Sequence, residues 1–197
     1  MSDDEPLKEM DYNPDVFLEQ FPLIKRFLYH LIYYRALHAA YAESRIQSEF
    51  WTHTIDAHLL QAAINWCMVF GSHGCNPTHW KKLSPTQSDE LEASFRGGLT
   101  KAAGISWTEW EKYWEEITGF RNNYVAHRAI GFDNPIPKFD LALKIAYYYD
   151  GWIRQVIYPD HFEEPSLNET AEKVRSAIAP LIARLLSVTK ETQKDSE

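Results

Sequence analysis

The stretch SWTEWEKYWEEITGFRNNYVAHRAIG, residues 106 to 131, has the periodicity of one amphipathic helix. It begins with a capping box, because Ser106 stands three residues before Glu109. It ends at Gly131, the residue type favoured just after a helix. On a wheel of about 100° per residue, its tryptophans and later apolar residues form one stripe. The stretch therefore predicts a helix from Trp107 to Ala129 that buries one face.

Helix start signals recur along the rest of the chain, and alternating strand patterns are missing from the sequence. Two further capping boxes are predicted, at Ser84–Gln87 and Ser166–Glu169. The other expected helices cover about residues 14 or 22 to 45, 48 to 70, 85 to 103, 137 to 158, and 167 to 188 with a kink at Pro180. We therefore expect an all-α fold, an up-and-down helical bundle of about five to six helices.

Length and composition favour a single domain. The chain has 197 residues, of which 45% are hydrophobic and 14% aromatic. This is enough chain to bury a core without disulfides or metals. We expect a flexible acidic N-terminus over residues 1–13, one helical domain over residues 14–188, and a flexible tail over residues 189–197.

Charge and cysteine content limit the classes of partner. The two cysteines suggest no disulfide framework, and the acidic N-terminus lacks the apolar run of a signal peptide. No stretch reaches the ~18 apolar residues of a membrane span. We therefore expect a cytoplasmic protein without membrane contact. The net charge of −8 argues against binding nucleic acid by bulk electrostatics, but it allows a small local basic site.

Arginine interrupts the apolar stripe of the quoted stretch. On the wheel, the stripe centres near about 290°, while Arg121 falls near about 320° and Arg128 near about 300°. Arginine is almost never fully buried without a partner. One explanation is an internal ion pair to a glutamate such as Glu43 or Glu49, or a side chain that reaches water at the helix end. The other is a site for an anion, for which the guanidinium favours a phosphate.

His127 stands at the border of the same stripe. A border histidine is more often structural, but histidine and arginine together are a minimal set for phosphodiester chemistry. On one helix, Arg121 and His127 would be about 9 Å apart along the axis and about 120° around it. A compact site would therefore form more easily between two copies across a twofold axis. Asn123, four residues before His127, could orient the imidazole.

The segment RNNYVAH, residues 121 to 127, resembles the R-x(4–6)-H motif of the HEPN superfamily. The longer string FRNNYVAHR looks most like the abortive-infection branch of that superfamily. INWCMVFGSHGCNPTHWKKL, residues 64 to 83, is similar to the end of the second helix and the following loop in that branch. The resemblance covers roughly residues 15 to 160.

This resemblance implies a HEPN-like bundle that forms a homodimer with the two motifs facing each other in a cleft. It implies metal-independent RNA cleavage, in which the ribose 2′-hydroxyl attacks the adjacent phosphate and leaves a 2′,3′-cyclic phosphate and a 5′-hydroxyl. His127 would be the acid or base, Arg121 would hold the scissile phosphate, and Asn122 would position one of them. To these we add three expected nucleic-acid contacts, Arg128, Asn123 and Tyr124.

Four cysteine and histidine residues follow one another at spacings that suggest a metal site. Cys67, His73, Cys75 and His79 are residue types that zinc prefers, but their spacing matches no standard zinc finger. We expect the chain to bind no metal and to need no cofactor.

Three functions remain open from the sequence. The favoured one is an RNA-cleaving homodimer that acts in phage defence or in a toxin system with an antitoxin partner. The second is a non-catalytic HEPN-like module that binds a nucleotide, RNA or a protein. The third is a structural helical dimer in which Arg121 is ion-paired.

Overall fold

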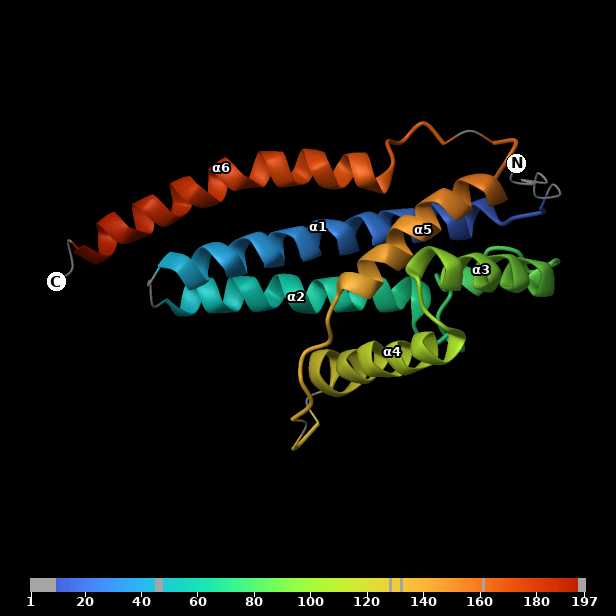
Figure 1. The fold of residues 1–197 in the computed structure, drawn as a ribbon, viewed down its shortest axis with the longest axis horizontal. Helices are drawn as coiled ribbons and strands as arrows, with labels where there is room; N and C mark the ends of the chain where they lie inside the picture. Colours follow the sequence, from blue (N-terminus) through green and yellow to red (C-terminus); the bar gives the residue numbers. More distant parts are fainter. Residues whose placement is uncertain (1–9, 45–47, 128, 132, 161, 195–197) are drawn as a thin grey trace.

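The computed structural model describes residues 10–44, 48–127, 129–131, 133–160 and 162–194, with side chains as far as residue 189. Every regular element in these residues is helical, which confirms the all-α fold class (Figure 1). The elements in chain order are α1 (Pro14–Ser44), α2 (Glu49–Phe70), the 3-10 turn η1 (Trp80–Lys82), α3 (Ser88–Ala103), α4 (Trp107–Phe120), the π-helix η2 (Arg121–Ala126), α5 (Asp140–Val156) and α6 (Leu167–Lys194).

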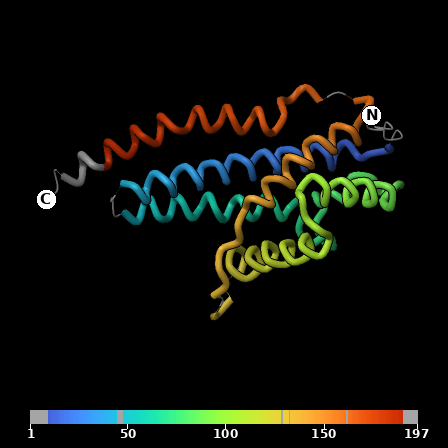
Figure 2. Tube along the Cα trace, in the orientation of Figure 1, coloured from blue at the N-terminus to red at the C-terminus, as the bar shows by residue number. Residues whose placement is uncertain are grey.

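The long helices set the shape of the molecule. α1 and α2 form an antiparallel hairpin, and α6 packs along α1. In Figure 2, α6 and α2 lie on opposite sides of α1. In Figure 1, the C-terminal part of α6 extends past the paired ends of α1 and α2. α5 packs on α3, and α4 with η2 packs on α2. None of the described helices is long and apolar enough to span a bilayer.

Helix starts agree with the sequence where a cap is formed. The Ser106 hydroxyl accepts from Glu109 N, and the Glu109 carboxylate accepts from Ser106 N. Ser166 and Glu169 make the same reciprocal pair at the start of α6. The capping boxes predicted at Ser106 and Ser166 are therefore confirmed. α6 then runs as one gently curved helix through Pro180 to Lys194, beyond the end predicted at residue 188 (Figure 1).

The capping box predicted at Ser84 is wrong. Gln87 N does donate to the Ser84 hydroxyl at 3.3 Å, but the chain makes a turn there and α3 begins only at Ser88. The Gln87 side chain is used elsewhere, because its Oε1 accepts from Asp11 N at 2.8 Å. A tertiary hydrogen bond thus replaces the local cap.

The N-terminal residues that the structure describes are tied to the domain. Asn13 N donates to Leu83 O at 2.7 Å, and Met10 is buried. The Asn13 side chain accepts from the first amides of α1, so the helix begins at Pro14, at a position proline favours. Residues 1–9 of the expected flexible segment lie outside the described residues.

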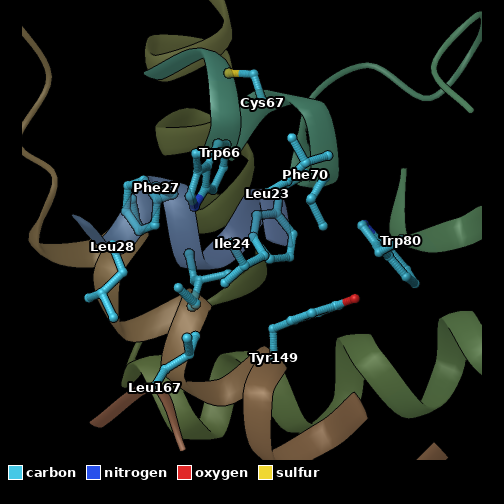
Figure 3. Packing of buried hydrophobic residues seen from close by; sticks show 14 of the residues in the cluster. Leu23, Ile24, Phe27, Leu28, Trp66, Cys67, Phe70, Trp80, Tyr149 and Leu167 are labelled. Carbon is cyan, nitrogen blue, oxygen red and sulfur yellow. The ribbon is translucent and has the colours of Figure 1, made fainter. Parts of the chain in front are cut away.

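Most of the apolar residues form one core between α1, α2, α4 and α5. Figure 3 shows Ile24, Phe27 and Leu28 of α1 facing Trp66 and Phe70 of α2. The apolar side of α2 is buried at Ile55, Leu59, Ala62, Ala63 and Trp66. A smaller cluster, formed by Leu37, Trp51, Ile55 and Ile182, ties α6 to the far end of the hairpin.

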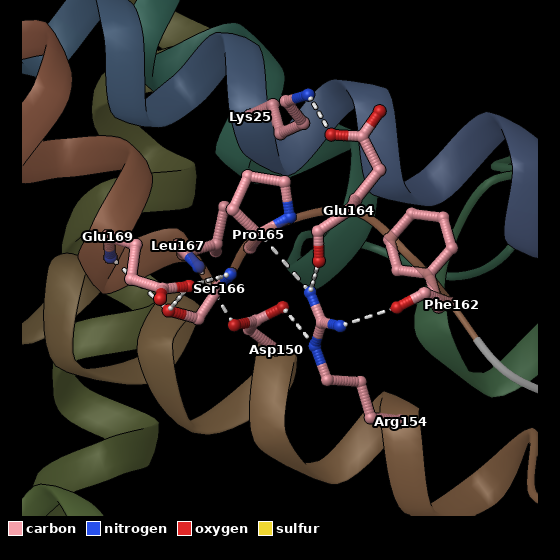
Figure 4. A network of polar contacts seen from close by, with 9 residues as sticks. All are labelled: Lys25, Asp150, Arg154, Phe162, Glu164, Pro165, Ser166, Leu167 and Glu169. Carbon is pink, nitrogen blue, oxygen red and sulfur yellow. Dashed lines mark hydrogen bonds and ion pairs between the residues drawn. The ribbon is translucent and has the colours of Figure 1, made fainter.

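A buried polar network fixes the start of α6 (Figure 4). Asp150 of α5 is 4% exposed, and its two oxygens accept from Arg154 Nε at 3.0 Å and from Leu167 N at 2.9 Å. Arg154 also donates to the carbonyls of Phe162, Glu164 and Pro165. One carboxylate thus neutralises a cation and satisfies the first amide of α6.

Gly97 and Gly98 of α3 differ in what surrounds them, and this predicts opposite effects of alanine. A Cβ on Gly98 would lie 2.3 Å from the Tyr148 hydroxyl, which donates to Phe95 O at 3.0 Å, whereas a Cβ on Gly97 meets nothing within 4 Å. Gly97→Ala should stabilise the protein by up to about 1 kcal/mol through helix propensity. Gly98→Ala should destabilise it, because Tyr148 must move and lose its hydrogen bond. Urea unfolding of the two variants checks the signs, and equal effects would contradict this packing.

Candidate functional site

The helix that carries the R-x(4–6)-H motif changes from α to π at Arg121. α4 ends at Phe120, η2 covers Arg121–Ala126, and His127 is extended with φ −133° and ψ 118°. The predicted α-helix to Ala129 is therefore wrong in its last part. The reason is visible in the backbone, where His127 N donates to Asn122 O, five residues earlier, at 3.1 Å. Single π-helical turns are rare in proteins, but those that occur are often at functional sites.

Arg121 lies on the side of η2 that faces the end of α2. Its side chain is half-buried beside Cys67, and its Nε is buried with no hydrogen-bond acceptor among the described residues. Burial raises the pKa of the Cys67 thiol to about 12, and the positive charge of Arg121 and a hydrogen bond from its side chain oppose that rise. A neutral thiol therefore sits beside the guanidinium.

Arg121 makes no ion pair within the part of the chain that the structure describes. Glu43 and Glu49, the carboxylates considered from the sequence, flank the α1–α2 turn. That turn is about 27 Å along α2 from Cys67, at 1.5 Å per residue. Neither glutamate can neutralise Arg121, so the predicted internal ion pair to them does not form.

His127 and Asn122 are exposed at the end of η2. The Asn122 carbonyl holds the backbone of His127, while no described residue forms a hydrogen bond with the imidazole. In this structure Arg121 turns toward α2 and His127 toward solvent. The two residues lie at opposite ends of η2, and their side chains are not hydrogen-bonded to each other.

Asn123 and Tyr124 stabilise the π-helical turn. The Asn123 amide donates to Gly119 O at 3.0 Å, so it serves the helix backbone and not His127 as expected. The Tyr124 ring stacks on Phe120, with centroids 5.2 Å apart and planes at 15°, and it packs against the main core. Arg128, the other expected phosphate contact, lies outside the described residues.

The four cysteine and histidine residues considered for zinc are divided between different environments. Cys67 is buried under α4, whereas Cys75 and His73 are exposed in the loop after α2. The His79 ring is buried and accepts from Lys81 N at 3.1 Å, and burial lowers the pKa of His79 to about 3. Among the described residues, no group of three or more His, Cys, Asp or Glu could hold a metal ion.

The outward surface of α4 is acidic. Its exposed charged residues are Glu109, Glu111, Lys112, Glu115 and Glu116. A second copy or a nucleic-acid strand would be repelled along this surface. The apolar side chains Ile130 and Ile136, in contrast, are exposed in the segment that follows the motif. A partner is therefore accommodated better at the motif end of α4 than along its outer face.

A cavity of about 190 Å³, which we call the aromatic pocket, lies where α2, η1, α3 and α4 meet. Its lining side chains include two histidines, His73 and His79, and six Phe or Trp residues, namely Phe70, Trp80, Phe95, Trp107, Trp110 and Trp114. The sequence does not predict this pocket, because a helical wheel places the tryptophans of residues 107–114 on one continuous buried stripe. Trp107 and Trp114 are in fact only half-buried.

Hydrogen bonds hold two of these indole rings in place. Trp114 Nε1 donates to Phe70 O at 2.7 Å, and Trp107 Nε1 donates to Glu111 Oε1 at 2.8 Å. Trp114 thereby joins α4 to the end of α2. The aromatic pocket and Arg121 both lie along this α2–α4 contact, and Trp114 precedes Arg121 by about 10 Å along the helix.

Two cations border the aromatic pocket. Lys81 Nζ lies 5.6 Å from the Trp80 ring centroid, and the Arg96 guanidinium lies 4.7 Å from that of Trp107. Both pair with Glu92, which does not line the cavity. Burial tends to raise the pKa of Glu92, but the hydrogen bond from Lys81 and the two positive charges outweigh burial and lower it. Glu92 therefore stays ionised and positions both cations.

Comparison with known proteins adds no further information about this site. Searches against protein-family models, curated proteins and solved structures find no match for the chain.

Proposed function

We propose that this protein is a metal-independent, HEPN-like endoribonuclease that cleaves RNA with Arg121 and His127 at a homodimer cleft. In that role the chain would act in phage defence or as a toxin controlled by an antitoxin. The single observation that carries the proposal is the half-buried Arg121, whose Nε has no acceptor and which makes no ion pair in the described chain.

A guanidinium without an anionic partner near a core needs a physical reason. A buried N–H without an acceptor costs about 1–3 kcal/mol, and a charged group costs more. A phosphate would supply the missing acceptor and the missing charge, since guanidinium binds phosphate oxygens in a two-pronged geometry. Binding of the scissile phosphate would therefore recover energy that the free protein has lost.

His127 supplies the proton transfers that the cleavage reaction needs. One imidazole nitrogen accepts the proton of the ribose 2′-hydroxyl as that oxygen attacks phosphorus. The 5′-oxygen of the next nucleotide leaves and takes a proton from the imidazolium, directly or through water, which regenerates the imidazole and gives a 2′,3′-cyclic phosphate and a 5′-hydroxyl. The exposed His127 can reach a substrate in solvent. The Asn122 carbonyl accepts a hydrogen bond from His127 N and so fixes the position of the His127 backbone.

A second copy of the chain is part of the proposal, because one chain separates the two groups. Arg121 faces α2 while His127 faces solvent, so His127 of one protomer would meet the phosphate held by Arg121 of the other. The exposed Ile130 and Ile136 beside the motif offer apolar contacts for such a dimer. The acidic outer face of α4 would remain outside the interface.

The test is a cleavage assay on the purified protein with single-stranded RNA in the presence of EDTA. We expect cleavage products that carry a 2′,3′-cyclic phosphate and a 5′-hydroxyl, and a dimer by light scattering with an interface above about 1,000 Å² in total. Activity that disappears with the chelator, or a monomer at tens of micromolar, would overturn this form of the proposal.

A non-catalytic binding module is the second candidate, and two observations favour it. The Asn123 amide bonds Gly119 O and leaves the imidazole of His127 without an orienting partner. Arg121 is already half-buried against the Cys67 side chain. RNA binding without any cleaved product would identify this second function.

A further inference from the structure

The aromatic pocket is a built cavity that the ribonuclease proposal does not use. It is separate from Arg121 and His127, and its walls come from four consecutive elements, α2, η1, α3 and α4, that fold around it. Its rings are held by hydrogen bonds to Phe70 O and to Glu111, and Trp80 is stacked on Phe95 with centroids 4.1 Å apart. A cavity whose walls are fixed in this way is ready to accept a rigid ligand.

The chemistry of the walls selects a flat, electron-delocalised ring. Indole faces stack on heteroaromatic rings such as nucleic-acid bases. This stacking does not depend on which base is present, because every base has a π-face. Trp80 and Trp110 line the cavity, and no hydrogen bond from either indole N–H to a described residue is present. At about 190 Å³ the cavity is smaller than the range of about 300–1,000 Å³ typical for drug-sized ligands, which suits one ring system.

The charges at the border select an anionic tail on that ring. Of the lining side chains with a full charge, Lys81 and Arg96 are cationic and Glu111 is anionic. Glu111 already accepts the Trp107 indole N–H, whereas the donors of Lys81 and Arg96 exceed what Glu92 can accept. The chain as a whole has a net charge of −8, so Lys81 and Arg96 form a local positive site on an acidic protein.

We propose that the aromatic pocket binds a nucleotide, with the base stacked between its tryptophans and the phosphate held by Lys81 and Arg96. The nucleotide could be free in solution or an unpaired residue of a single-stranded RNA. Because Trp114 and Arg121 lie along the same α2–α4 contact about 10 Å apart, a short strand bound in the pocket reaches the motif.

The test measures binding to the His127→Ala variant, so that cleavage cannot consume the probe. Titrations use tryptophan fluorescence and calorimetry with four mononucleotides, the matching nucleosides, ribose 5-phosphate, tetramethylammonium and a ten-nucleotide single-stranded RNA. We expect a mononucleotide or the RNA to bind at least about tenfold more tightly than the nucleosides and than ribose 5-phosphate, because each of these lacks one of the two recognised groups. This experiment is independent of the ribonuclease proposal, since binding is read without cleavage.

Two pairs of substitutions, made in the same background, locate the binding. Trp107→Leu should weaken binding about tenfold or more, whereas Phe50→Leu, at a 70% exposed position at the start of α2, should not. Lys81→Gln should weaken binding of the nucleotide but not of the nucleoside, whereas Lys82→Gln, at an exposed neighbour that does not line the cavity, should leave both unchanged. Circular dichroism of each variant confirms that it is folded.

The possible results are distinct. Binding of the RNA but not of mononucleotides identifies a strand as the ligand, and the reverse identifies a free nucleotide. Ribose 5-phosphate that binds as tightly as the nucleotide would overturn base recognition, and preferential binding of tetramethylammonium would show that the rings form a cage for a cation. The absence of binding by all probes at millimolar concentration, or equal losses in Lys81→Gln and Lys82→Gln, would also overturn the proposal.

Discussion

Replacing His127 by alanine should abolish RNA cleavage and leave the fold intact. The side chain is exposed and makes no hydrogen bond with described residues, so its loss should change the free energy of unfolding by less than about 1 kcal/mol. Cleavage should fall by about two to four orders of magnitude, the usual contribution of a general acid or base. Initial cleavage rates together with thermal unfolding measure both effects.

Matched variants separate chemistry from folding. His53→Ala removes another exposed histidine, on α2, and should leave cleavage unchanged. Arg121→Met keeps the packing against Cys67 and should preserve the fold while abolishing cleavage, and Arg121→Lys should not restore it, because lysine lacks the planar fork. Full activity in His127→Ala would end the catalytic role of this residue.

Replacing Asp150 by alanine should cause the largest loss of stability among the substitutions considered. The change would leave the half-buried Arg154 without its counter-charge and Leu167 N without its acceptor (Figure 4). Removing one partner from such a buried network costs about 3 kcal/mol or more. Asp150→Asn should cost less, because an amide oxygen can still accept from Leu167 N. Urea unfolding gives both values.

A surface ion pair of the same segment provides the control. Lys25 Nζ lies 2.7 Å from Glu164 Oε2, and both side chains are partly exposed. Lys25→Met should therefore change the free energy of unfolding by less than about 1 kcal/mol. If Asp150→Ala and Lys25→Met have the same effect, the buried network does not anchor α6.

The positions of the helices were largely predictable because their signals are local. The capping boxes at Ser106 and Ser166 act within one turn, and the apolar spacing of α2 places its buried side. The error at Ser84 has the opposite origin. There the local signal competed with a hydrogen bond from Asp11, a residue far away in sequence, and the tertiary contact prevailed.

The residues of the candidate site stay a prediction, whereas part of their expected geometry is wrong. A wheel of 100° per residue assumes an unbroken α-helix, and that assumption fails where the π-helical turn begins at Arg121. The wheel correctly placed Arg121 toward the interior, but the partner there is Cys67 and not a carboxylate. Asn123 was expected beside His127, yet its amide bonds the backbone of Gly119.

The sequence by itself determined the all-α class, most helix starts and the position of the motif after a tryptophan-rich helix, because caps and periodicity depend on neighbouring residues. Only the tertiary structure decided where Arg121 points, how Asp150 anchors α6, and that aromatic rings from α2, η1, α3 and α4 enclose a pocket bordered by Lys81 and Arg96. These features require contacts between residues distant in the chain, and no local pattern encodes the packing of one helix against another.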